Sequence, residues 1–249
     1  MRRRTTAVLV AASALSLFAV TGQASAGTAH HPRSTAGVKA HIGASPNTPS
    51  TNYGAGYFSY LGTGNVVSVG ATFKAPPVTC ASTSDMEWLL PGIWIYDGGG
   101  NLSEQVDVNL NCNSGSQLRE DVICLNGVSC DTSLTINPND KVEVSFTNTP
   151  NYSTGVVRDI TQHTSATVTG PSQASDYTVF IGDEGPSLFG PTAVPTFTKV
   201  GFSIATVNGQ YLGDNGPAKY NLKTTSAVQI ATGALNSSGS GFNTTFKHN

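Results

Sequence analysis

Several common arrangements of catalytic residues are missing from this chain, which leaves carboxylate and amide chemistry. A serine hydrolase needs a base beside its nucleophile, yet the only histidines after residue 51 are His163 and His248. The chain also contains no G-x-S-x-G turn and no H-E-x-x-H metal motif. We therefore expect no metal site and no cofactor, and look to the glutamine, aspartate and glutamate side chains.

The run from Glu104 to Asn111 places such side chains on one face of an expected strand. Apolar and polar residues alternate along it, and alternate residues of a strand point to opposite faces. The apolar face carries Val106, Val108 and Leu110, and the polar face carries Gln105, Asp107, Asn109 and Asn111. The apolar face belongs in a core, so the polar face looks into solvent or a cleft.

Short strand-like runs of this kind continue along most of the chain, separated by turns rich in Gly, Pro and Asn. No segment shows sustained helical spacing. The expected strands are 53–60, 66–73, 87–96, 104–111, 117–124, 141–147, 155–159, 165–169, 177–181, 199–205, 227–231 and 242–247. Many short strands at this spacing predict an all-β fold, an antiparallel sandwich or barrel, in a single domain.

The first residues are typical of a secretory signal. Three arginines precede an apolar stretch at 7–20, and Ala24-Ser25-Ala26 resembles a cleavage site. Residues 1–26 are thus predicted to be removed, residues 27–51 to form a flexible linker or propeptide, and residues 52–249 to fold. The linker is rich in Ser, Thr, Pro, Gly and His. We expect a secreted, extracellular protein.

Charge argues against two classes of partner. Without the three arginines of the signal, ten basic residues remain against fifteen acidic ones. An acidic surface disfavours nucleic acids and anionic membranes. We expect neither as a partner, and expect a monomer.

The four cysteines suit disulfides in an exported chain. Four cysteines allow three connectivities. Cys124 and Cys130 flank Asn126-Gly127, a strong hairpin turn signal, so these two are predicted to face each other. That leaves Cys80 to pair with Cys112.

A set of motifs, in order along residues 52 to 249, resembles the eqolisins, the glutamic peptidases, in their bacterial secreted branch. The segment 52–57 resembles the family's N-W-A-G opening, and 69–80 resembles a strand ending in V-P-x-V. Residues 94–98 resemble W-V-G-x-D-G, 103–105 resemble the V-E-Q segment, 196–202 resemble F-G-x-V-x-F, and 246–248 resemble a W-K-H ending. The resemblance implies two packed antiparallel sheets with a curved face that forms a substrate cleft.

The resemblance also implies roles for individual residues. In the family a glutamate acts as general base on water while a glutamine amide stabilises the oxyanion. Gln105 matches the glutamine, and Asp176 occupies the position of the glutamate. Asp183 and Glu184 are interpreted as loop residues before Pro186. The predicted substrate-binding residues are Tyr53, Asp97, Glu104 and Glu120.

Three functions follow as alternatives. The first is an acid-active endopeptidase that uses Gln105 and Asp176. The second is a catalytically inactive relative that binds peptides or extracellular polymers, which the aspartate at the glutamate position and the loss of family aromatics at 117–123 favour. The third, a carbohydrate-active or lectin-like sandwich, ranks last because Glu104 and Asp107 lie on opposite strand faces.

Overall fold

The computed structural model describes residues 50–51, 54–62, 66–81, 87–98, 100–125, 129–172, 176–184, 193–223 and 227–248, with the backbone alone at 50–51, 129–131 and 176–177. They belong to one compact unit, Ala40–Asn249. The predicted signal and nearly all of the predicted linker lie outside the described residues. Among the described residues, no helix has the length and apolar character needed to cross a membrane.

The described chain is built almost entirely of strands. Their bounds are β1 Ser50–Thr51, β2 Gly54–Tyr60, β3 Ser68–Lys74, β4 Leu90–Asp97, β5 Leu102–Asn113, β6 Ser116–Leu125, β7 Ser129–Asp131, β8 Lys141–Asn148, β9 Tyr152–Asp159, β10 Thr164–Pro171, β11 Asp176–Glu184, β12 Lys199–Val207, β13 Gln210–Tyr211, β14 Ala218–Lys223, β15 Val228–Thr232 and β16 Phe242–Phe246. One short 3-10 helix, η2, spans Leu212–Asn215.

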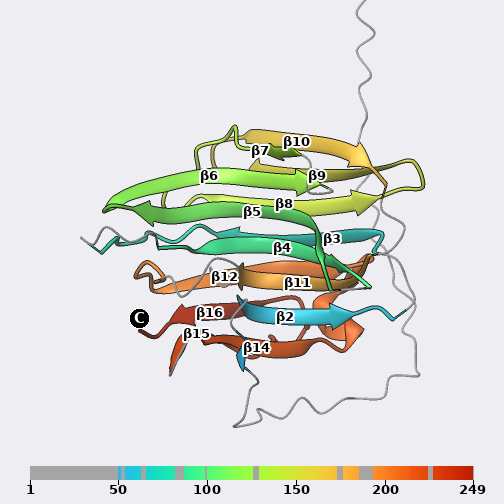
Figure 1. Ribbon diagram of the computed structural model, residues 1–249. Helices are drawn as coiled ribbons and strands as arrows, with labels where there is room; N and C mark the ends of the chain where they lie inside the picture. Colours follow the sequence, from blue (N-terminus) through green and yellow to red (C-terminus); the bar gives the residue numbers. More distant parts are fainter. Residues whose placement is uncertain are drawn as a thin grey trace, which may run out of the picture. The chain divides into compact units, whose positions relative to one another are not determined.

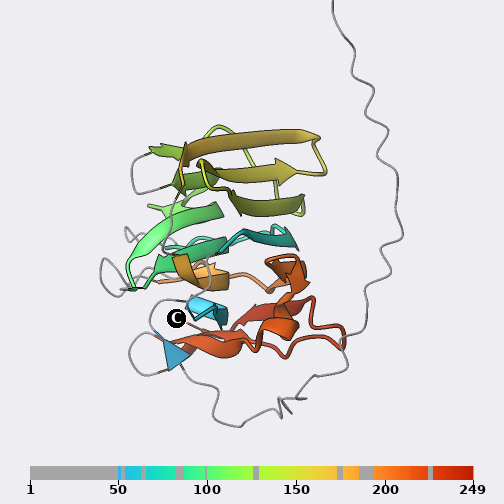
Figure 2. The ribbon, with the colours of Figure 1, turned by 90° about the vertical axis from the view of Figure 1, so that its right-hand side faces the viewer.

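The strands form one antiparallel path that folds back on itself into two layers. Its order is β10-β9-β8-β3-β12-β16-β15-β14-β2-β11-β4-β5-β6-β7. The path passes from one layer to the other at β14, which pairs with β15 on one side and β2 on the other. The layer of β2, β11, β4, β5 and β6 contacts the layer of β12, β3, β8 and β9 (Figures 1 and 2). The fold is an antiparallel β-sandwich, as predicted.

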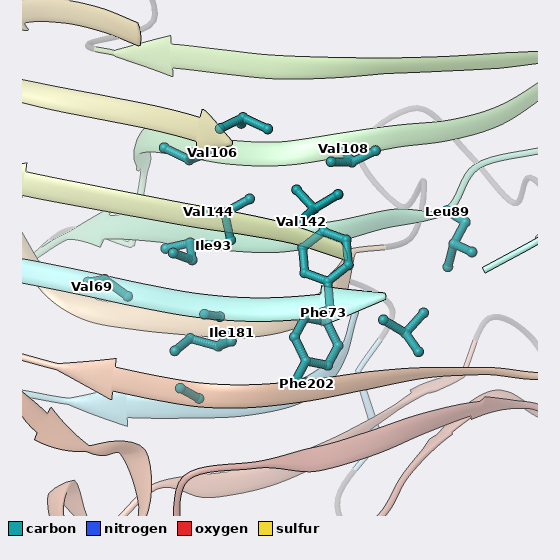
Figure 3. Packing of buried hydrophobic residues seen from close by; sticks show 14 of the residues in the cluster. Val69, Phe73, Leu89, Ile93, Val106, Val108, Val142, Val144, Ile181 and Phe202 are labelled. Carbon is teal, nitrogen blue, oxygen red and sulfur yellow. The ribbon is translucent and has the colours of Figure 1, made fainter. Parts of the chain in front are cut away.

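The core lies between the two layers and is formed by alternate residues of facing strands. Val106 and Val108 of β5 point into it, each at most 1% exposed, together with Ile93 and Ile181 of the same layer. The opposite layer contributes Val69, Phe73, Val142, Val144 and Phe202 (Figure 3). The apolar face predicted for residues 104–111 is therefore confirmed as core.

Twelve of the strands were predicted from sequence, and all twelve are present within a few residues of the predicted bounds. The strand that matters most among those not predicted is β14, Ala218–Lys223. Its sequence, A-K-Y-N-L-K, alternates apolar and polar residues over only six positions, and most of its residues are half-buried. Its place is set by pairing with β2 and β15 rather than by a local pattern.

The predicted disulfide between Cys80 and Cys112 is confirmed, with the two Cα atoms 5.5 Å apart. It ties the segment after β3 to the end of β5. Cys124 is also disulfide-bonded, and it stands opposite Cys130 in the register of β6 and β7. The side chain of Cys130 lies outside the described part of the chain.

Candidate functional site

The face of the β2–β11–β4–β5 sheet that points away from the core, called here the outer face, carries Gln105. In the strand register, Gln105 of β5 stands beside Trp94 of β4, Trp94 beside Phe180 of β11, and Phe180 beside Phe58 of β2. Trp94 and Phe180 are buried, at 0% and 1% exposed, and their ring centroids lie 5.4 Å apart. Gln105 thus ends a row of aromatic side chains.

The next row of the outer face is made of glycines and one carboxyl. Asp107 of β5 stands beside Gly92, and Gly92 beside Gly182 of β11. A Cβ on residue 92 would lie 2.3 Å from the Cβ of Asp107, a distance that real side chains do not allow. Gly92 is required because the Asp107 side chain occupies the space above it.

We expect Gly92→Ala to lower the free energy of unfolding by about 2 to 3 kcal/mol or more, since overpacking a tight site forces backbone shifts. Urea denaturation measures the loss. Gly70→Ala is the matched control, because its added Cβ would meet the Thr206 hydroxyl at 3.3 Å and the Val144 carbonyl oxygen at 4.0 Å. It should cost about 1 kcal/mol or less. Equal losses in the two variants would contradict the close approach at Asp107.

Gln105 and Asp107 are joined through their side chains. The Gln105 Nε2 group donates a hydrogen bond to Asp107 Oδ2 at 2.5 Å. Gln105 is half-buried, whereas Asp107 is 0% exposed. Burial raises the pKa of Asp107 to about 8; the Gln105 hydrogen bond lowers it and the nearby Asp121 raises it. The Gln105 amide is therefore hydrogen-bonded to a buried carboxyl.

A second carboxyl, that of Glu184, lies on the same face. Glu184 is two residues beyond Gly182 on β11 and is 7% exposed. Burial raises its pKa to about 8, and the Asp107 carboxylate raises it further. The Trp94 indole lowers it, although the indole N–H makes no hydrogen bond of ordinary geometry. The outer face thus brings together an amide and two carboxyl groups that repel each other when both are charged.

Such a set can move a proton and stabilise a developing oxyanion. A carboxylate accepts a proton from water, and an amide N–H donates to negative charge on oxygen. Two carboxyls whose charges oppose each other favour one ionised and one neutral group. Such groups are suited to general acid–base chemistry.

The structure does not bring Asp176 beside Gln105. Asp176 begins β11 and pairs with Asp97, whereas Gln105 pairs with Trp94, three residues earlier on β4. The two backbones are separated by roughly 10 Å along the strands and roughly 10 Å across them. The side chain of Asp176 is outside the described residues.

The predicted substrate-binding residues take different positions. Asp97 ends β4, where its carboxylate accepts from the Asn101 backbone N–H at 2.8 Å. Glu104 is 1% exposed and points to the core side of β5, opposite to Gln105. Glu120 lies on the outer face, where Asn109 donates to it at 3.4 Å. Tyr53 lies outside the described residues.

The interpretation of Asp183 and Glu184 as loop residues is wrong, because both belong to β11. Asp183 points to the core side, is 0% exposed, and its Oδ2 accepts from the Thr244 hydroxyl. Burial raises the pKa of Asp183 to about 7, and the Thr244 hydrogen bond lowers it. The Gly-Pro sequence after Glu184 suggested a turn and hid the length of the strand.

Sequence reasoning did not assign a role to Asp107 or Glu184. The signal for Asp107 was present, because the alternation puts it on the same strand face as Gln105. Glu184 gave no comparable signal, since its proximity depends on the pairing of β11 with β4. Both residues join the candidate site through the structure.

The sandwich and its outer face define a class of fold, that of the eqolisins, or glutamic peptidases. Scytalido-glutamic peptidase with a peptide-based transition-state analogue matches with a TM-score of 0.61 and 13% identity, over 79% of this chain and 98% of that chain. SCP-B, an eqolisin solved with the tripeptide Ala-Ile-His, matches with a TM-score of 0.58 and 13% identity, over 79% of this chain and 98% of that chain. Aspergilloglutamic peptidase from Aspergillus niger matches with a TM-score of 0.50 and 18% identity, over 65% of this chain and 100% of that chain.

At these identities the likeness is one of fold. No protein-family model matches the chain, and no curated protein sequence matches it.

Proposed function

We propose that this chain is a secreted hydrolase that cleaves peptide bonds in polypeptides with the Gln105 amide and a carboxyl group. The observation that supports it best is the half-buried Gln105 amide held against a buried carboxyl on the outer face of an eqolisin-like sandwich. The Gln105 amide would donate a hydrogen bond to the oxyanion that forms when water attacks the peptide carbonyl. A carboxylate would take the proton from that water.

Two carboxyls compete for the role of base. Asp176 is the choice that the family resemblance implies, and Glu184 is the one that shares the outer face with Gln105. With Asp176 as the base, activity in acid is expected, because low pH helps to protonate the leaving amine. With Glu184 as the base, activity should instead rise toward pH 8, because burial raises its pKa to about 8 and only the ionised carboxylate can take a proton. Cleavage measured for Asp176→Asn and Glu184→Gln decides between the two, since only the true base is indispensable.

Replacement of Gln105 is the central test. Gln105→Ala should lower kcat by about 100-fold to 1,000-fold, the range for loss of one oxyanion donor, with a smaller change in KM. The measurement is cleavage of an unfolded, labelled polypeptide by the mature protein from pH 2 to 9. Glu143→Gln, a half-buried position on β8 in the other layer that pairs with Arg158, is the control. Full activity in Gln105→Ala, or no cleavage by the wild type at any pH, would refute the proposal.

A second candidate function is peptide binding without hydrolysis. The strand register favours it, because Asp176, at the position of the family's base, pairs with Asp97 and not with a neighbour of Gln105. The chain has two tryptophans, and both Trp88 and Trp94 belong to the aromatic cluster of the outer face. Tryptophan fluorescence during titration with an unfolded polypeptide therefore reports binding whether or not cleavage follows.

A further inference from the structure

Asp107 holds a position in which its protonation state decides how the neighbouring amide is held. It is fully buried beneath Gln105, and its Oδ2 accepts the only side-chain hydrogen bond recorded for that amide among the described residues. Its other oxygen, Oδ1, is buried and has no hydrogen-bond partner. An unpaired buried carboxylate oxygen is costly, so this carboxyl gains from carrying a proton.

The charges around Asp107 act in the same direction. Asp121 of β6 raises its pKa, and Glu184 of β11 is the other carboxyl that interacts with it. The neighbour on β4 is Gly92, which has no side chain. On β6 the residue opposite Asp107 is Val122, and Asp121 lies on the core side of the sheet beside Val108. Burial, with the charge of Asp121 adding to it, raises the pKa of Asp107 to about 8.

The two protonation states of a carboxyl favour different orientations of a neighbouring amide. An ionised carboxylate only accepts, so it takes a hydrogen bond from Nε2 and turns the amide carbonyl outward. A neutral carboxyl has an O–H that can donate to the amide carbonyl, which turns the NH₂ group outward instead. The observed hydrogen bond from Nε2 to Asp107 is the arrangement that the ionised form requires.

We propose that Asp107 is a positioning residue whose protonation turns the Gln105 amide so that both of its N–H groups face the substrate. This inference rests on the proposed function, in which those N–H groups stabilise the oxyanion. Neutral Asp107 donates its O–H to Gln105 Oε1 and frees the NH₂ group for the substrate carbonyl oxygen. Ionised Asp107 draws the NH₂ group inward and leaves a carbonyl oxygen facing the oxyanion, which repels it.

The protonation state of Asp107 sets the direction in which pH changes kcat. Below a pH of about 8 Asp107 is neutral, the NH₂ group faces outward, and the hydrolase is competent. Above it the amide turns and kcat falls. Asp107 thereby supports activity in acid without itself exchanging a proton with the substrate.

The test combines NMR of the Gln105 side-chain NH₂ with kinetics on the mature protein. The NH₂ signals are assigned by their absence in Gln105→Ala. In the wild type we expect them to shift with a midpoint near pH 8, and kcat to fall at least tenfold through the same midpoint. In Asp107→Asn the side chain is neutral at every pH, so the shift of the NH₂ signals and the fall of kcat between pH 5 and pH 9 should both disappear.

Asp107→Ala removes the support and leaves the amide free to rotate. It should lower kcat at pH 5 by about 10-fold to 100-fold, the scale of a misplaced catalytic group, with KM changed less than threefold. Thermal unfolding of each variant confirms that it is folded. If Asp107→Ala does not fold, Asp107→Asn alone decides through its NH₂ signals and pH profile.

The possible outcomes separate this inference from the proposed function. Gln105 signals that do not move between pH 5 and 9, or that move equally in Asp107→Asn, would overturn the positioning role even if the protein is an active peptidase. An inactive wild type whose Gln105 signals still titrate with Asp107 would refute the hydrolase and its oxyanion role. The coupling of the two side chains would then stand on its own as a pH-dependent change in a binding face.

Discussion

The protein is expected to be more stable at pH 5 than at pH 8, by on the order of 3 kcal/mol or more. The cause is burial of three carboxyl groups, those of Asp107, Asp183 and Glu184, which raises their pKa values to about 8, 7 and 8. In the unfolded chain the same groups ionise near pH 4. Between about pH 4 and pH 7 to 8 the folded state therefore binds more protons than the unfolded state.

The sign of the effect follows from proton linkage. Stability falls with rising pH wherever the folded state holds more protons, and each group contributes at most about 1.4 kcal/mol per pH unit. The stabilisation is fully present below pH 4 and is lost as the pH rises through the folded pKa values. Many proteins behave in the opposite way, because their paired carboxylates must be protonated for acid to unfold them.

The variant Asp183→Asn isolates the contribution of Asp183 to the pH dependence of the free energy of unfolding. The amide keeps the shape of the side chain and a hydrogen-bond acceptor for Thr244, but it carries no charge at any pH. We expect the variant to lose about 1.4 kcal/mol per pH unit of the slope between pH 4 and 7 and to be more stable than wild type at pH 8. Urea denaturation at several pH values measures both, with Glu143→Gln on β8, which removes a carboxyl that is only half-buried, as control. An unchanged slope in Asp183→Asn would contradict the burial of a neutral Asp183.

The sequence was sufficient to predict the sandwich because strand alternation is a local property. The run at 104–111 alternates with a period of two, and the structure buries its apolar side chains as predicted. The disulfide between Cys80 and Cys112 could be inferred because the other two cysteines flank a turn signal. These features depend on residues close together in the chain.

Features of the candidate site that depend on strand register could not be predicted in this way. Val179, Phe180 and Ile181 of β11 are all buried, so this strand shows no alternation that would reveal its length. The burial of Asp107 depends on Gly92 of β4, and the burial of the outer face depends on aromatic rings from three different strands. Only the pairing of β5, β4 and β11 brings these residues together.

The disulfide between Cys80 and Cys112 is expected to carry a large share of the stability of the sheet that holds Gln105. The two cysteines are 32 positions apart, and the loop that they close contains β4 and most of β5. A cross-link of this span limits the freedom of the unfolded chain by about 3 to 4 kcal/mol. Replacing both cysteines by serine should lower the thermal unfolding midpoint by roughly 10 °C.

The contacts around the disulfide between Cys80 and Cys112 indicate which part of the sheet its removal would loosen. Glu87 pairs with Cys112 through backbone hydrogen bonds in both directions, and the Glu87 carboxylate accepts from the Ala81 backbone N–H at 2.9 Å. Without the disulfide, the segment before β4 is held only by hydrogen bonds, these and those of Trp88 and Leu89 with neighbouring strands and segments. Hydrogen exchange of β4 and β5 amides should therefore accelerate more than that of β8 and β9 in the opposite layer.

Removal of Cys124 and Cys130 together is the matched comparison. Their predicted bond closes a loop of only a few residues, and loop-closure entropy grows with loop length, so its loss should cost about 2 kcal/mol. Differential scanning calorimetry of the two double variants under non-reducing conditions measures the difference. A loss for the Cys80 and Cys112 variant that is no larger than for the other pair would show that the longer cross-link does not anchor the sheet, and that the backbone pairing of Glu87 with Cys112 already holds β4 against β5.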